Sequence, residues 1–264
     1  NHYNNTTFET LNIVNKTANA FENHRVVTKL ADGTTVTNTT LKTLNVETKG
    51  DYELKYNVGG LSSINLKGKG EATKAQIVTH PGQSLGMPTD GRYPLQGTQD
   101  INLTAEGLKT LEVAAAGKII TTRNVSLTST TDKENATVTY GQIGESATAK
   151  ANDVSINATG QKTLTTGNIY ANGDVNLTTK FTQEGSVANY TAGNTYTSGD
   201  ITINHTSNSN ITDGVINFLS HAKARNFTVN ASGYKELNIN NSTNQRITAT
   251  GDMTFNLKAS VAGS

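Results

Sequence analysis

A short motif that recurs every 26 residues constrains the fold of this chain more than any other feature of its sequence. The motif reads polar, apolar, polar, apolar, polar, and its most regular copies are DVNLT (174–178), DITIN (200–204), NFTVN (226–230) and DMTFN (252–256). Such alternation is typical of a β-strand with one buried and one exposed face. A fixed period of this length indicates a repeat architecture, in which similar units stack on one another.

Further copies of the motif precede these four at less regular intervals. They are TLNI (10–13), TLNV (43–46), SINL (63–66), DINLT (100–104), NVSLT (124–128) and DVSIN (153–157). Apolar segments between the copies, such as LEV (111–113), Leu164 and LNI (237–239), indicate additional strands. We therefore predict an all-β chain, folded as a right-handed parallel β-helix or β-solenoid with about 26 residues per coil. The alternative is a two-sheet β-sandwich, which also consists of short strands at regular intervals.

The composition agrees with a narrow, repetitive interior. Hydrophobic residues make up 34% of the chain and charged residues 16%, whereas globular proteins average about 45–50% and about 25%. Threonine, which is frequent here, suits exposed strand positions. Asparagine suits the corners between strands because it tolerates left-handed backbone angles. We expect a single repetitive domain over residues 1–264.

Charge, hydropathy and cysteine content disfavour several classes of protein. A net charge of +1 argues against a nucleic-acid partner, which requires a basic face. No apolar run reaches the ~18 residues of a membrane-spanning helix, so no membrane-spanning segment is expected. The absence of cysteine removes disulfides and thiolate metal sites. For residues 212–225 we expect a strand, or a short helical insertion at a corner.

All three prolines fall in one segment, residues 80–95. Because proline cannot donate a hydrogen bond to a sheet ladder, we predict a protruding loop here. Long loops are often functional, and this one offers Met87, Arg92 and Tyr93 as candidate binding residues. The alternative is an insertion that is tolerated at a corner.

Three aspartates, Asp174, Asp200 and Asp252, occupy equivalent positions in the motif, and each follows a glycine. Stacked carboxylates repel unless a cation such as Ca²⁺ lies between them, which makes these residues candidate metal ligands or catalytic acids. A Gly-Asp pair at the start of a strand is also a common turn sequence, and we favour that interpretation. Apart from this alternative Ca²⁺ site, no cofactor is expected.

The sequence shows no constellation that indicates catalysis. The five histidines lack the spacing of metal ligands, and we expect His205 at an exposed or corner position. No phosphate-binding glycine loop occurs. We expect the nine tyrosines not to recur in register. The protein is therefore predicted not to be an enzyme.

Sixteen sites match the N-glycosylation pattern Asn-x-Ser/Thr. In a strand, positions i and i+2 share one face, so a face rich in asparagine and threonine generates this pattern without glycans. Asn4, Asn135 and Asn241 lie in expected loops and are the candidate glycan acceptors.

Segments such as GDVNLTTK (173–180), SGDITINHT (198–206) and TGDMTFNLKAS (250–260) resemble the repeats of large secreted bacterial β-solenoids, above all the filamentous-haemagglutinin type of adhesin. The segments LKTLNV (41–46), LSSINL (61–66) and LKTLEV (108–113) are similar to the repetitive region of bacterial surface-layer (S-layer) proteins. The Asn-Pro-Asn motifs of the adhesin secretion domain are missing. The resemblance therefore extends only to an internal or C-terminal part of such a protein, and it assigns no functional residue.

The resemblance implies an extracellular location on the cell surface and a structural or adhesive role, within an S-layer, a fibre or an adhesin. The partners that it implies are copies of the chain itself or other cell-surface proteins and glycans. It also implies a glycoprotein, because the asparagine- and threonine-rich adhesins of this type are glycosylated. The alternative is a carbohydrate-binding or polysaccharide-degrading β-helix protein.

Overall fold

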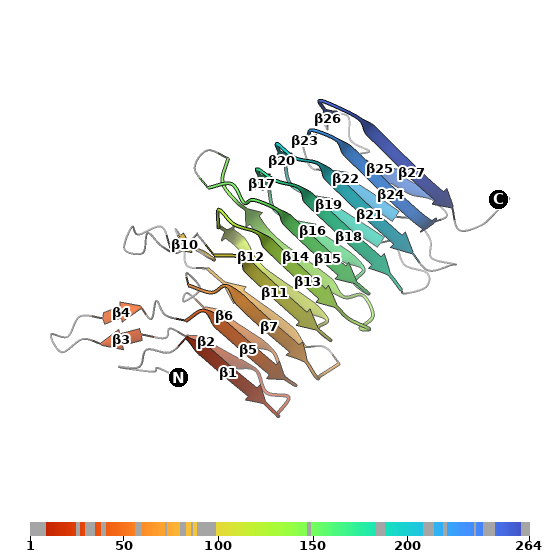
Figure 1. The fold of residues 1–264 in the computed structure, drawn as a ribbon. Coiled ribbons are helices and arrows are strands. Elements are labelled where there is room, and N and C mark those ends of the chain that lie inside the picture. The colour runs from red at the N-terminus through yellow and green to blue at the C-terminus, as the bar shows by residue number, and fades with distance from the viewer. Residues whose placement is uncertain are drawn as a thin grey trace.

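A computed structural model describes residues 9–24, 27–29, 35–37, 41–55, 60–71, 73–79, 83–85, 87–88, 99–146, 149–182, 188–207, 214–218, 221–234, 236–239 and 246–259. Every regular element in these ranges is a β-strand, so the expected all-β class is confirmed. The strands form two large sheets and one small hairpin. Figure 1 shows the strands of the large sheets side by side in one elongated stack, from the N-terminal strands in red to the C-terminal strands in blue.

The ten-stranded sheet contains one strand for each copy of the sequence motif. Its strands, in spatial order, are β1 (Thr10–Asn15), β5 (Thr43–Thr48), β7 (Ser63–Gly68), β11 (Ile101–Glu106), β13 (Val125–Thr130), β15 (Val154–Thr159), β18 (Val175–Phe181), β21 (Ile201–Ser207), β24 (Phe227–Tyr234) and β27 (Met253–Ala259). Neighbouring strands pair in parallel along the whole sheet. Because the spatial order is the chain order, each repeat lies beside the repeat before it and the repeat after it.

The 26-residue copies pair in register, as the sequence predicts. Val175 pairs with Ile201, Ile201 with Phe227, and Phe227 with Met253. The first three side chains are fully buried. Met253 is 46% exposed instead, because β27 is the last strand of the sheet.

The fifteen-stranded sheet supplies the other strands of each repeat. Its main row consists of β2 (Phe21–His24), β6 (Tyr52–Lys55), β8 (Lys74–Val78), β12 (Thr110–Ile119), β14 (Thr137–Ile143), β16 (Thr163–Thr166), β19 (Ala188–Ala192), β22 (Gly214–Phe218) and β25 (Leu237–Ile239). From the end of β14 a second row continues with β17 (Ile169–Ala171), β20 (Thr195–Thr197), β23 (His221–Ala224) and β26 (Arg246–Ala249). Each C-terminal repeat therefore contributes three strands, for example β18, β19 and β20.

Residues 212–225 illustrate this division of a repeat into strands. The strand that the sequence favours is present in the described part of this segment, where β22 and β23 belong to the two rows of the fifteen-stranded sheet.

The small hairpin lies between β2 and β5 in the chain and pairs β3 (Val27–Lys29) with β4 (Thr35–Thr37) in antiparallel fashion. Among the described residues there is no apolar helix of membrane-spanning length.

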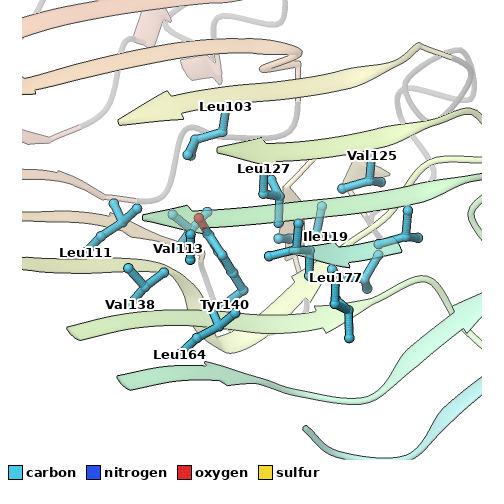
Figure 2. Packing of buried hydrophobic residues seen from close by; sticks show 14 of the residues in the cluster. Leu103, Leu111, Val113, Ile119, Val125, Leu127, Val138, Tyr140, Leu164 and Leu177 are labelled. Carbon is cyan, nitrogen blue, oxygen red and sulfur yellow. The ribbon is translucent and has the colours of Figure 1, made fainter. Parts of the chain in front are cut away.

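Side chains from the two large sheets meet in one interior. Figure 2 shows Leu103 and Leu127 of the ten-stranded sheet near Val113 and Tyr140 of the fifteen-stranded sheet. One inward-facing column crosses all ten strands: Leu11, Leu44, Ile64, Leu103, Leu127, Ile156, Leu177, Ile203, Val229 and Phe255. All of these except Phe255 belong to a single buried cluster. The alternation of the motif thus places its apolar residues inside and its polar residues outside.

The segment at 80–95, for which the sequence predicts a protruding loop, partly belongs to the fifteen-stranded sheet. Its described strands are β9 (Gln83–Leu85) and β10 (Met87–Pro88), which pair with each other in antiparallel fashion. β9 also pairs in parallel with β12, where Leu85 lies beside Ile119. Leu85 is fully buried, so this part of the segment contributes to the interior.

Candidate functional site

The outer face of the ten-stranded sheet presents polar side chains in columns, because every second residue of each strand points away from the interior. One column contains Thr10, Thr43, Ser63, Asn102, Ser126, Ser155, Asn176, Thr202, Thr228 and Thr254. The next contains Asn12, Asn45, Asn65, Thr104, Thr128, Asn157, Thr178, Asn204, Asn230 and Asn256. We call these two columns the polar face. Every residue in it is a threonine, a serine or an asparagine.

Asparagines at both ends of the second column bond to one another across the strands. In the N-terminal asparagine ladder, Asn65 donates from Nδ2 to Oδ1 of Asn45, and Asn45 donates to Asn12, each at 2.8 Å. In the C-terminal asparagine ladder, Asn256 donates to Asn230 and Asn230 donates to Asn204, again at 2.8 Å. In-register strands about 4.8 Å apart bring identical amides within bonding distance. In both ladders the later strand is the donor.

A hollow overlies each asparagine ladder. The N-terminal hollow is lined by Asn12, Asn45 and Asn65 together with Glu47, Lys67 and Glu106, among other residues. The C-terminal hollow is lined by Asn204, Asn230 and Asn256 together with Ser232, Phe255 and Lys258, among others. Charges of alternating sign line the N-terminal hollow, from Glu47 through Lys67 to Glu106. Nζ of Lys67 lies 3.8 Å from Oε2 of Glu106. The two hollows therefore offer amide and hydroxyl groups, with more charge at the N-terminal one.

The three candidate metal-binding aspartates lie in a column of their own at the entrance of the strands. This column, which we call the Asx ladder, consists of Asp100, Asn124, Asp153, Asp174, Asp200, Asn226 and Asp252. In each of the first six members, Oδ1 accepts a hydrogen bond from the backbone N–H of the next member, at 2.8–3.2 Å. Asp174 and Asp200 thus fix the backbone of the following repeat, and Asp252 donates its N–H to Asn226.

Arg225 forms an ion pair with one member of this ladder, Asp200. Its Nε lies 2.8 Å from Oδ1 of Asp200 and its Nη2 lies 3.0 Å from Oδ2. These hydrogen bonds hold the pKa of Asp200 below its usual range. In the part of the chain that the structure describes, no group of three or more His, Cys, Asp or Glu side chains could hold a metal ion.

The other candidate site residues are only partly covered by the structure. Met87 lies in β10, whereas Arg92 and Tyr93 lie outside the described residues. Among the candidate glycan acceptors, Asn4 and Asn241 also lie outside them. Asn135 is exposed in the turn between β13 and β14. Its backbone is left-handed, with φ of 54°, and its Oδ1 accepts a hydrogen bond from Lys162 at 3.1 Å.

The expectation of an exposed or corner position for His205 is wrong, because this side chain is fully buried. Its ring stacks on Tyr234, with centroids 4.8 Å apart, and meets Phe181 edge-on at 5.1 Å. Nδ1 bonds to the hydroxyl of Thr179. Burial lowers the pKa of His205 to about 3. Alternation could have placed it correctly, since His205 has the same parity in β21 as the inward-facing Ile203.

The expectation that tyrosines do not recur in register is also wrong at one place. Tyr170 of β17 pairs with Tyr196 of β20, and their rings stack with centroids 5.8 Å apart. Both side chains are partly exposed. They form an aromatic pair on the outer face of the second row of the fifteen-stranded sheet.

Comparison of the chain with protein-family models, with curated proteins and with solved structures finds no match. The polar face and the aromatic pair are therefore the two surface features that point to a function.

Proposed function

We propose that this chain is a right-handed parallel β-helix that serves as a structural or adhesive protein on the outside of a cell. It acts through self-association or through contacts with cell-surface proteins and glycans, and not as an enzyme. The fold part of the proposal is supported by two parallel sheets that follow the same chain order. Connections between parallel strands are right-handed in about 98% of cases, which supports the handedness.

The observation that carries the function is the continuity of the polar face across all ten strands. At the ordinary strand spacing and rise, the sheet is about 45 Å long and about 20 Å wide. That area is comparable to the ~800 Å² that each partner contributes to a standard protein interface. A regular surface of hydroxyl and amide groups offers many similar weak contacts, which suits attachment to a repetitive partner.

Binding of the purified chain to cells, to isolated cell envelopes and to glycan arrays tests this proposal. The double variant Ser155→Lys/Thr202→Lys places two lysines on the polar face and is expected to reduce binding at least about tenfold, equivalent to about 1.4 kcal/mol. The matched control is Thr139→Lys/Thr191→Lys, which places lysines on the outer face of the fifteen-stranded sheet. Equal binding by both variants would contradict the assignment of the polar face.

The aromatic pair supports a second candidate, a carbohydrate-binding protein, because partly exposed aromatic rings can stack on sugar rings. Under this alternative, Tyr170→Ala/Tyr196→Ala loses glycan binding while the polar-face variant keeps it. Incubation with polysaccharides, followed by sizing of the products, separates a binding protein from a degrading one.

A further inference from the structure

The polar face is most regular over five neighbouring strands in the middle of the ten-stranded sheet, β13, β15, β18, β21 and β24. Each of them pairs in parallel with a strand on both sides, so the exposure of their outward side chains does not depend on the ends of the stack. We call the ten polar-face residues of these strands the central block: Ser126, Thr128, Ser155, Asn157, Asn176, Thr178, Thr202, Asn204, Thr228 and Asn230. All ten are at least partly exposed.

Strand geometry makes the central block a two-dimensional lattice. The five strands pair with one another without a register shift, so the side chains of one column repeat at the strand spacing of about 4.8 Å. The two polar-face residues of one strand are two positions apart, which separates them by about 6.6 Å. Figure 1 shows the five strands running in nearly the same direction, so the lattice continues across all of them.

The side chains of the central block are restrained before any ligand binds. Threonine is branched at Cβ and therefore has few χ1 rotamers, so its hydroxyl and methyl groups recur in similar positions. Asn230 donates to Asn204 at 2.8 Å, and Asn157 donates to Ser155 at 3.4 Å, which restrains these amides. Four hydroxyl groups form no hydrogen bond with a described residue and are available to a ligand on the sheet: Thr128, Thr178, Thr202 and Thr228.

The chemistry of this lattice disfavours two classes of extended partner. The central block contains no charged side chain, whereas the metal ions of a mineral surface require carboxylate ligands. It contains no aromatic ring, whereas crystalline polysaccharides are bound by stacking on such rings. The next outward column on the same strands adds one charge, Lys180, among hydroxyl side chains: Thr130, Thr159, Thr206 and Ser232. A neutral lattice of hydroxyl, amide and methyl groups fits a surface that is itself a neutral lattice of hydrogen-bonding groups.

The surface of ice has this chemistry and a similar geometry. Each surface water molecule both donates and accepts hydrogen bonds, as hydroxyl and amide groups also do. On the prism faces of ordinary ice, water molecules repeat in two perpendicular directions at spacings close to those of the central block, slightly shorter along the stack and slightly longer along the strands. Because the side chains are already restrained, little conformational entropy is lost when they bind.

We propose that the central block binds to the surface of ice, with its two columns aligned along the shorter repeat of the prism face. Its hydroxyl groups occupy positions of lattice water, and the bound chain blocks further growth of the ice beneath it. This inference goes beyond the proposed function, on which it rests only for a location outside the cell, and it assigns a specific ligand to part of the polar face.

Slow growth of a single ice crystal in a solution of the purified chain tests the proposal. Wild type is expected to separate the freezing from the melting temperature, a gap called thermal hysteresis, and to be enriched in the ice. Thr178→Tyr places a ring above the lattice and should abolish both effects. The matched control is Thr165→Tyr, which adds the same ring to the outer face of the fifteen-stranded sheet and should retain both. The reverse outcome for the two variants would overturn the assignment.

Lys180→Thr provides a second test, which a loss of folding cannot mimic. It removes the single charge from the column beside the central block and extends the hydroxyl lattice, so thermal hysteresis at equal concentration should rise. The control Lys223→Thr removes an exposed lysine from the second row of the fifteen-stranded sheet and should change nothing.

Absence of thermal hysteresis in wild type refutes the inference, as does retention of the chain on crystalline cellulose or chitin but not on ice. Binding to cells is measured separately, at temperatures at which no ice is present. A chain that binds cells but not ice leaves the proposed function standing without this inference, and a chain that binds ice but not cells leaves the inference standing alone.

Discussion

At the ends of some strands, the backbone conformation limits which residue can be accommodated. Gly160 directly follows β15 with φ of +87°, and a Cβ atom there would overlap the carbonyl oxygen of Thr131. We expect Gly160→Ala to lower the free energy of unfolding by about 2 kcal/mol, because it adds both strain and a clash. Urea denaturation measures this loss. The neighbouring Thr159→Ala should cost far less, since its side chain points outward; similar losses for the two variants would contradict the explanation.

The buried histidine predicts a specific dependence of stability on pH. The pKa of His205 falls to about 3 in the folded chain, against about 6.5 in an unfolded one. The unfolded state therefore takes up the proton first, and stability is lost as pH falls from about 6.5 towards 3. At pH 5 the loss is about 2 kcal/mol.

Urea denaturation of wild type and His205→Phe at pH 7 and pH 5 tests this. Phenylalanine keeps a ring between Phe181 and Tyr234 but cannot take up a proton. The difference in free energy of unfolding between wild type and His205→Phe should therefore change by about 2 kcal/mol between pH 7 and pH 5. His221→Gln is the control and should behave as wild type does. Parallel pH curves for wild type and His205→Phe would show that this ring does not titrate as described.

At the level of strands, substitutions in the Asx ladder can distinguish a turn role of Asp174 from a metal-binding role. Asp174→Asn keeps the acceptor for the N–H of Asp200, as Asn124 and Asn226 do elsewhere in the ladder. We expect it to retain wild-type stability. Asp174→Ala removes one hydrogen bond and should cost about 1 kcal/mol. Thermal unfolding of the wild-type chain should give the same melting temperature with Ca²⁺ as with a chelator. If Ca²⁺ raised the melting temperature of wild type but not that of Asp174→Asn, the metal-site interpretation would be the correct one.

Strand prediction succeeded where alternation and repetition coincide. The ten motif copies became the ten strands of one sheet, because a period of two fixes which residues face inward and the repeat fixes which strands are neighbours. The second row of the other sheet escaped prediction, since strands as short as β17 and β20 contain only 3 residues each. In so short a segment, alternation cannot be distinguished from chance. The pair Tyr170 and Tyr196 lies in these two strands; the sequence signal that could have found it is its 26-residue spacing, since each tyrosine stands four residues before a motif aspartate.

For the whole molecule, stacking of neighbours predicts a gradient of stability along the chain. Each repeat of a linear array gains from the repeats on both sides, whereas a terminal repeat gains from one. Hydrogen exchange followed by mass spectrometry should therefore give the slowest amide exchange in central strands such as β15 and β18. Faster exchange is expected in β27, whose inward residues are half exposed. Uniform protection from β15 to β27 would show that the chain unfolds as one unit.

Exact repetition of the unit has an evolutionary consequence. β21, β24 and β27 follow one another at 26 residues and pair in register as far as Ser232, after which the pairing of β24 with β27 shifts. Duplication or loss of a single unit would therefore leave most of each flanking junction unchanged. A lineage could thus lengthen or shorten such a molecule in steps of about 4.8 Å without redesigning its surface, so that reach and chemistry evolve independently.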